Sequence, residues 1–83
     1  MGAKELYRMG VKCLSSGDTA GAIEAFEQAL GEDDAFYMAR LGWAQALDRG
    51  GDVDGAIQQI RHALESAPEE PLAHASLSRL YQQ

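Results

Sequence analysis

The chain has 83 residues, of which 46% are hydrophobic and 24% charged, and its formal net charge is −6. A chain of this length forms one domain, residues 1–83. A single compact core of this size is small, whereas stacked repeats stabilise one another through their interfaces. The negative charge argues against binding to nucleic acid or to an anionic membrane surface, because both need a basic protein face.

The cysteine content and the hydropathy pattern indicate the cellular compartment of the protein. Cys13 is the single cysteine, so no disulfide forms within the chain, and a free thiol suits a reducing compartment. The first residues lack the apolar core of a signal peptide, and no apolar run is long enough to span a bilayer. We therefore expect a cytoplasmic protein that does not contact membranes.

The composition predicts helices. Alanine and leucine are abundant while β-branched residues are sparse, which favours helix over sheet. The predicted helices span residues 3–15, 19–31, 35–49, 53–66 and 71–82. Short connections make neighbouring helices antiparallel. In the first helix, Leu6, Met9, Gly10 and Cys13 recur three and four residues apart, which predicts a buried stripe.

The strongest feature is an internal repeat with an offset of 34 residues. The segment 17–23 reads GDTAGAI and the segment 51–57 reads GDVDGAI. Gly17 and Gly51 are expected to end helices, since glycine adopts the left-handed backbone of a helix terminus. Asp18 and Asp52 are expected to cap the helices that follow.

Small residues and prolines extend the repeat. Two alanines lie seven residues apart within each predicted second helix: Ala22 and Ala29 in one, and Ala56 and Ala63 in the other. Small side chains on one face allow two helices to approach closely. Pro68 and Pro71 mark the end of the second hairpin, because proline interrupts a helix but is tolerated in its first turn.

This pattern resembles the tetratricopeptide family, whose 34-residue repeat is a pair of helices. The family favours a large residue, Leu-Gly and an aromatic residue in the first helix, then Ala, an aromatic residue and Ala in the second, and Pro in the loop. The matching positions of the first repeat are Leu6, Met9, Gly10, Cys13, Ala22, Phe26, Ala29 and Asp34. Those of the second are Arg40, Trp43, Ala44, Leu47, Ala56, Ile60, Ala63 and Pro68, and those of a partial third are His74, Leu77, Ser78 and Tyr81.

The resemblance implies an all-α fold, a right-handed superhelix of antiparallel helical hairpins with five helices and about two and a half repeats. The repeats would span about 3–36 and 37–70, with a partial repeat or capping helix at 71–83. The third helix has two possible registers, because Leu41-Gly42 also matches the Leu-Gly pair. We prefer the constant offset of 34. The last helix is either a solubilising cap or the start of a longer array.

Charge is divided between the helices. The predicted first helices of the hairpins carry a net charge of +4, whereas the segments 18–34 and 52–70 together carry −10. In the resembling family the first helices line a concave groove. The groove would then be mildly basic and would suit an apolar ligand with an acidic element. Alternatively, the acidic surfaces only keep the protein in solution.

The resemblance also names the groove residues. The partner-binding candidates are Lys4, Tyr7, Arg8, Val11, Met38, Leu41, Gln45, Leu72 and Arg79, and the same face includes Asp48 and Ala75. Tyr7 is the first candidate for a ligand contact, since aromatic residues dominate interfaces. Its alternative role is ordinary packing at the N-terminal edge.

The sequence predicts no catalytic, cofactor or metal site. His62 and His74 lie on different predicted helices, and Cys13 occupies a predicted core position, so no set of three or four metal ligands is apparent. We therefore expect a binding protein and not an enzyme. Its leading function is a scaffold that holds a peptide segment or partner protein in the groove.

The alternative is a structural module that forms homo-oligomers or belongs to a longer array. The contact surface would then be an apolar edge on the last helix, formed by Leu72, Leu77, Leu80 and Tyr81.

Overall fold

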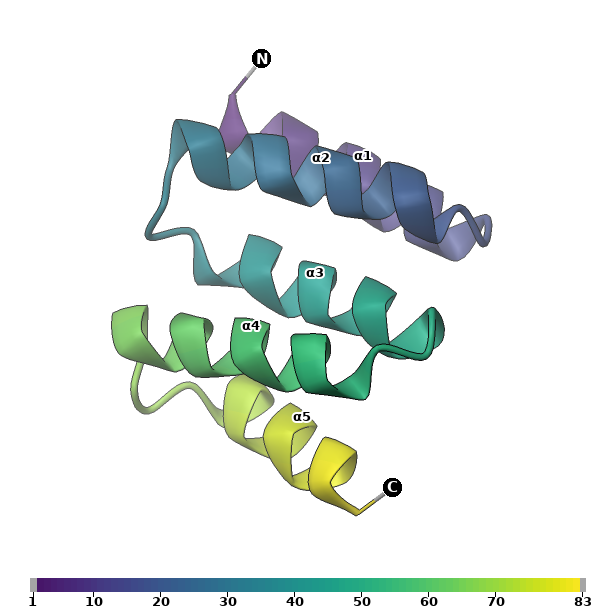
Figure 1. Cartoon of the computed structure of the whole chain (residues 1–83). Helices are drawn as coiled ribbons and strands as arrows, with labels where there is room; N and C mark the ends of the chain where they lie inside the picture. Colours follow the sequence, from purple (N-terminus) through teal and green to yellow (C-terminus); the bar gives the residue numbers. More distant parts are fainter. Residues whose placement is uncertain (1, 83) are drawn as a thin grey trace.

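The structure is a computed structural model that describes residues 2–82. Within these residues the chain forms five α-helices packed as successive antiparallel hairpins, which confirms the all-α prediction (Figure 1). The helices are α1 (Ala3–Ser15), α2 (Thr19–Glu32), α3 (Tyr37–Arg49), α4 (Val53–Ser66) and α5 (Pro71–Tyr81). The bounds of α3 and α4 are those of α1 and α2 shifted by 34 residues.

The two turns inside the hairpins have the same geometry. Gly17 and Gly51 take left-handed backbone angles, with φ of 87° and 91°. The amide of Asp18 donates to the Cys13 carbonyl at 2.8 Å, and the amide of Asp52 donates to the Leu47 carbonyl at the same distance. This pairing closes a helix by satisfying carbonyls that have no partner within it. Because the bond recurs at a shift of 34, the third helix follows the constant offset.

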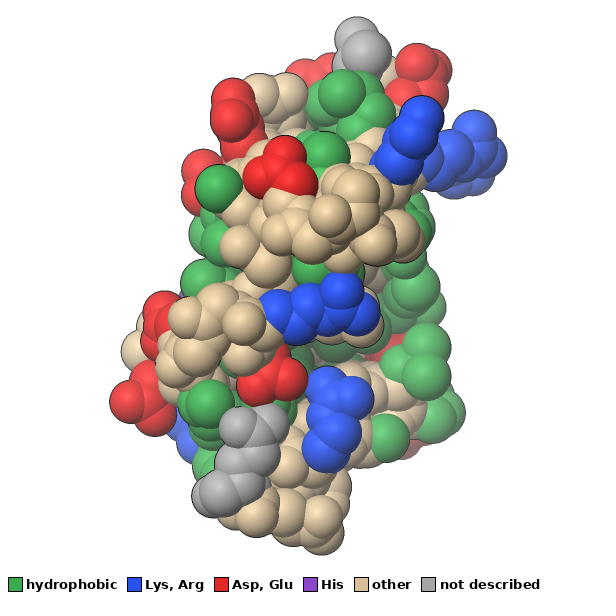
Figure 2. Space-filling model, turned by 90° about the vertical axis from the view of Figure 1, so that its right-hand side faces the viewer, with side chains coloured by type: hydrophobic (Ala, Val, Ile, Leu, Met, Phe, Trp, Pro, Cys, Tyr) green, Lys and Arg blue, Asp and Glu red, His purple; other side chains and the backbone are tan. Residues whose placement is uncertain are grey.

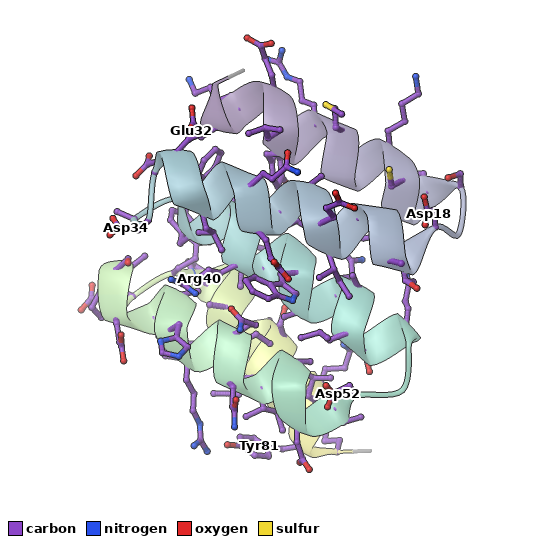
Figure 3. The ribbon with its side chains drawn as sticks, turned by 45° about the horizontal axis from the view of Figure 1, so that its top comes forward. Asp18, Glu32, Asp34, Arg40, Asp52 and Tyr81 are labelled. Carbon is purple, nitrogen blue, oxygen red and sulfur yellow. The ribbon has the colours of Figure 1, made fainter. Side chains whose placement is uncertain are left out.

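The aspartates of these turns cap the next helices. The Asp18 side chain accepts a hydrogen bond from the Gly21 amide, and that of Asp52 accepts one from Gly55, both at 2.9 Å. Each carboxylate satisfies an amide that has no partner within the first turn of its helix. Figure 3 shows Asp18 at the turn of the first hairpin and Asp52 at the turn of the second.

The third helix begins two residues later than predicted, at Tyr37 instead of residue 35. The Asp33 side chain accepts a hydrogen bond from the Ala35 amide at 3.1 Å, and the Asp33 carbonyl accepts one from Phe36 at 3.1 Å. These bonds fold residues 33–36 into a turn that competes with helix. The predicted ends of the second and fifth helices each differ from the structure by one residue.

The core is built from alanines and two larger side chains. The four alanines of the repeat have no exposed surface, as their spacing predicted: Ala22, Ala29, Ala56 and Ala63. Phe26 of α2 and Ile60 of α4 occupy equivalent positions and are the largest fully buried side chains among the described residues. The ring of Phe26 lies between Gly10 of α1 and Gly42 of α3. The absence of side chains at both glycines therefore allows three helices to meet around one ring.

The predicted stripe on α1 is wrong at Met9, which is 44% exposed. Its equivalents Trp43 and Leu77 are half-buried, because each packs against the core of the preceding hairpin. No helix of residues 2–82 precedes α1, so nothing among them covers Met9. Leu14 is buried instead, and Cys13 is half-buried.

Candidate functional site

A cleft of about 200 Å³ opens between the first helices of the hairpins. Its walls come from α1, α3 and α5, and one residue of α4 reaches its floor. The lining residues are Tyr7, Met38, Leu41, Gly42, Ala44, Gln45, Ile60, Leu72, Ser76, Arg79 and Leu80. Figure 1 shows the order in which α1, α3 and α5 follow one another along the stack.

The two hairpins differ in the residues that meet at the junction with the next helix. In the first, the Phe26 ring fills the space between its glycine neighbours. In the second, the smaller Ile60 stands at the equivalent position and Ala44 replaces Gly10. Ser76 of α5 occupies the place that corresponds to Gly42, and it lines the cleft together with Ile60. Ile60 and Ala44 therefore line the cleft, whereas Phe26 and Gly10 do not.

Most of the predicted groove residues meet at this cleft. Six of them line it: Tyr7, Met38, Leu41, Gln45, Leu72 and Arg79. Lys4, Arg8 and Val11 do not line it, and they lie exposed on α1. The prediction did not include Ser76, although its helical spacing from Leu72 and Arg79 could have indicated it.

Tyr7 packs within the first hairpin and also borders the cleft. Its ring centroid lies 5.8 Å from that of Phe26 and 5.5 Å from that of Phe36, so its ring belongs to the packing of the first hairpin. It also lines the cleft. Aromatic pairs at such distances stabilise a fold beyond the area they bury. The Tyr7 wall of the cleft is therefore held in place by two neighbouring rings.

Arginine hydrogen bonds fix the helices around the cleft. Arg40 Nη1 of α3 donates to Gln59 Oε1 of α4 at 3.1 Å. Arg49 Nη1 of α3 donates to the Leu14 carbonyl of α1 at 3.0 Å, which joins the two hairpins. The Arg61 guanidinium of α4 donates to the Tyr81 hydroxyl of α5. Each pair joins two helices, and Arg40 and Tyr81 are labelled in Figure 3.

Comparison with known proteins identifies the family of this chain. Residues 14–80 match the family model described as Tetratricopeptide repeat. The chain belongs to the tetratricopeptide repeat family. It is 40% identical over 63 residues to Tetratricopeptide repeat protein 36 of Xenopus tropicalis. That alignment covers 76% of this chain and 31% of the relative, so the chain spans about a third of the relative's length. Tetratricopeptide repeat domains are generally protein-protein interaction modules.

The charge at the cleft of this tetratricopeptide repeat domain comes from one residue. Arg79 is the only charged side chain in the lining, and no carboxylate lines it. Within residues 2–82 no carboxylate lies within salt-bridge distance of the Arg79 guanidinium. The face in Figure 2 carries Lys and Arg side chains at several levels between the two ends of the chain.

The predicted apolar edge on α5 is wrong at Leu80. This side chain is only 3% exposed, because it packs into the core formed with Ala44, Ile60 and Ala73. Leu77 is half-buried against the same core. Leu72 and Tyr81 are exposed as predicted, by 57% and 56%. The exposed apolar surface of α5 is therefore narrower than the sequence indicated.

The loop before α5 contacts the start of α3 and the first turns of α5. The Glu70 carboxylate lies beside the Tyr37 hydroxyl at the start of α3, and its acceptor oxygen and its negative charge raise the pKa of Tyr37 above 10. The same side chain caps α5 by accepting from the Leu72 amide at 3.2 Å. His74 Nε2 lies 2.7 Å from the Pro68 carbonyl. These contacts hold the loop against α3 and α5.

No group of three or more potential metal ligands is present among residues 2–82. None of the helices in that range has the length and apolar character needed to cross a membrane.

Proposed function

We propose that this tetratricopeptide repeat domain holds a peptide segment of a partner protein in the cleft between α1, α3 and α5. The observation that carries the proposal is the convergence of six predicted groove residues on one cleft. The lining mixes apolar side chains with a few polar groups, which is typical of sites that bind peptides. The general role of the family in protein-protein interaction supports a scaffold over a catalyst.

The domain organisation belongs to the same proposal. We infer that residues 3–36 and 37–70 form two repeats and that residues 71–83 form a partial repeat or a cap. The shared helix bounds and the shared turns support this division. Met1 and Gln83, the ends of the predicted domain, lie outside the described residues. We further propose a cytoplasmic location, which the single free thiol suits.

Site-specific photocrosslinking tests the cleft. A photoreactive phenylalanine analogue replaces Gln45, which is exposed at the cleft, or Gln58, which is exposed on α4 and does not line it. Both variants are added to extract of the source cell, and the crosslinked proteins are identified. We expect at least one partner to be captured from position 45 and not from position 58. Equal capture from both positions would refute binding at the cleft.

Self-association is the second candidate function, and the exposure of Leu72 and Tyr81 favours it. Large exposed apolar side chains on one helix can mark a contact between copies. Light scattering over a hundredfold range of concentration measures the mass. A mass that rises with concentration, and returns to that of one chain in Leu72→Ser, would support this candidate. A constant mass of one chain would remove it.

A further inference from the structure

We infer that the cleft takes one large apolar side chain of the bound segment while a carboxylate of the same segment pairs with Arg79. This inference rests on the proposed function and specifies the chemistry of the ligand. It differs from a generally basic groove, because it assigns the ionic contact to α5 and not to the cations of α1.

The size of the cleft sets the first half of the inference. An apolar cavity of about 150 Å³ accommodates a benzene molecule. The cleft has about 200 Å³, which suits one aromatic or branched aliphatic side chain and not several. Its floor includes Ala44 and Ile60, which are almost fully buried, and Met38, Leu41 and Leu72 add apolar walls. Burial of one large apolar side chain strengthens binding by about 10- to 150-fold before the costs of association.

The second half follows from the charges. Arg79 lines the cleft without an ionic partner among residues 2–82, and no carboxylate lines it. A carboxylate on the ligand would therefore meet a guanidinium that no acidic side chain of the cleft neutralises. A lysine or arginine in the same place would meet a like charge, which costs affinity. Lys4 and Arg8 do not line the cleft, so they contribute only a longer-range field that salt screens.

Along α5, the apolar and ionic contacts lie close together. Leu72, Ser76 and Arg79 are spaced four and three residues apart, which places them on one face of the helix. An apolar anchor between Leu41 and Leu72 would leave a neighbouring residue of the ligand near Arg79. We therefore expect a motif in which a large apolar residue lies within about two residues of Asp or Glu, the reach of an extended segment.

A random heptapeptide library, displayed on phage and selected on the full chain, tests the motif. We expect the selected peptides to pair Phe, Tyr, Trp or Leu with a nearby Asp or Glu. The tightest peptide is then synthesised and titrated against Arg79→Glu and against Arg8→Glu, which is matched in chemistry but lies outside the cleft. Arg79→Glu removes an exposed ion pair and adds a like-charge contact, so together these should weaken binding by about five- to tenfold. Arg8→Glu should change it by less than about twofold.

Variants of the cleft lining distinguish a failure of this inference from a failure of the proposed function. Ser76→Leu adds bulk to a half-buried lining position and should abolish binding of the selected peptide. If this variant does not fold, Leu72→Ala removes an exposed apolar wall and should weaken binding without affecting the fold. If the selected peptides lack acidic residues and do not bind these variants, the pairing with Arg79 is wrong. Binding of a peptide in the cleft would still be supported. Peptides that bind both variants normally would overturn both proposals.

Discussion

The ring of Phe26 is the point at which three helices meet, and Gly10→Ala tests that arrangement. A Cβ placed on Gly10 would lie 2.5 Å from Cε1 of the ring, whereas carbon atoms in contact are about 3.5–4.0 Å apart. The ring would have to move by about 1 Å. It cannot move away freely, because a Cβ placed on Gly42 would also lie 2.5 Å from it. The ring is therefore held on both sides.

Two opposing effects set the change in the free energy of unfolding that Gly10→Ala causes. Overpacking of a filled core costs about 1–3 kcal/mol, and the confined ring places this site near the upper limit. Replacing glycine by alanine within a helix stabilises the folded state by about 1 kcal/mol. We therefore expect Gly10→Ala to lower the free energy of unfolding by about 2 kcal/mol. For a domain of this size that corresponds to a fall in melting temperature of roughly 8–16 °C.

Thermal unfolding followed by circular dichroism measures the effect, with Gly31→Ala as the matched control. Gly31 also lies in a helix, but a Cβ there would have open space around it. The control should melt at or slightly above the temperature of the unchanged chain. In a Phe26→Ile background, which copies the second hairpin, Gly10→Ala should cost little. The packing argument is wrong if Gly10→Ala melts as high as Gly31→Ala, or if its cost is the same in both backgrounds.

Two further predictions concern single contacts. Asp52→Ala should lower the free energy of unfolding by about 1 kcal/mol, because the first turn of α4 loses its side-chain cap; urea unfolding measures this, and an equal loss in Asp34→Ala would contradict it. For Tyr37, the raised pKa means that the folded state holds the phenolic proton more tightly than the unfolded state. That contribution to stability should be complete below pH 10 and lost as the pH rises through the folded pKa. Absorbance titration, with Tyr37→Phe as the subtracted reference, should give a midpoint above 10 that falls in Glu70→Gln; an unchanged midpoint would exclude Glu70 as the cause.

The candidate site could be predicted only in part. Family positions placed six residues at the cleft, including Leu41 and Arg79 on different helices. They also placed Lys4, Arg8 and Val11 there, but these exposed side chains of α1 do not line the cleft. Ile60 lines the cleft whereas its equivalent Phe26 does not, and periodicity treats both simply as large apolar residues.

The sequence by itself determined the helices and their turns. Gly17 with Asp18, and Gly51 with Asp52, marked two helix boundaries, because capping and left-handed turns depend on residues within about six positions of one another. Even the late start of α3 reflects a local turn at Asp33 that periodicity overlooked.

Only the tertiary structure decided which apolar side chains are covered. Met9 and Trp43 are equivalent in the repeat, yet Met9 is exposed and Trp43 packs against the first hairpin. Leu80 is buried although α5 is the last helix described. Whether a side chain is buried depends on which neighbouring element packs against it. A repeat that fixes each helix therefore still leaves open what covers the first and last of them.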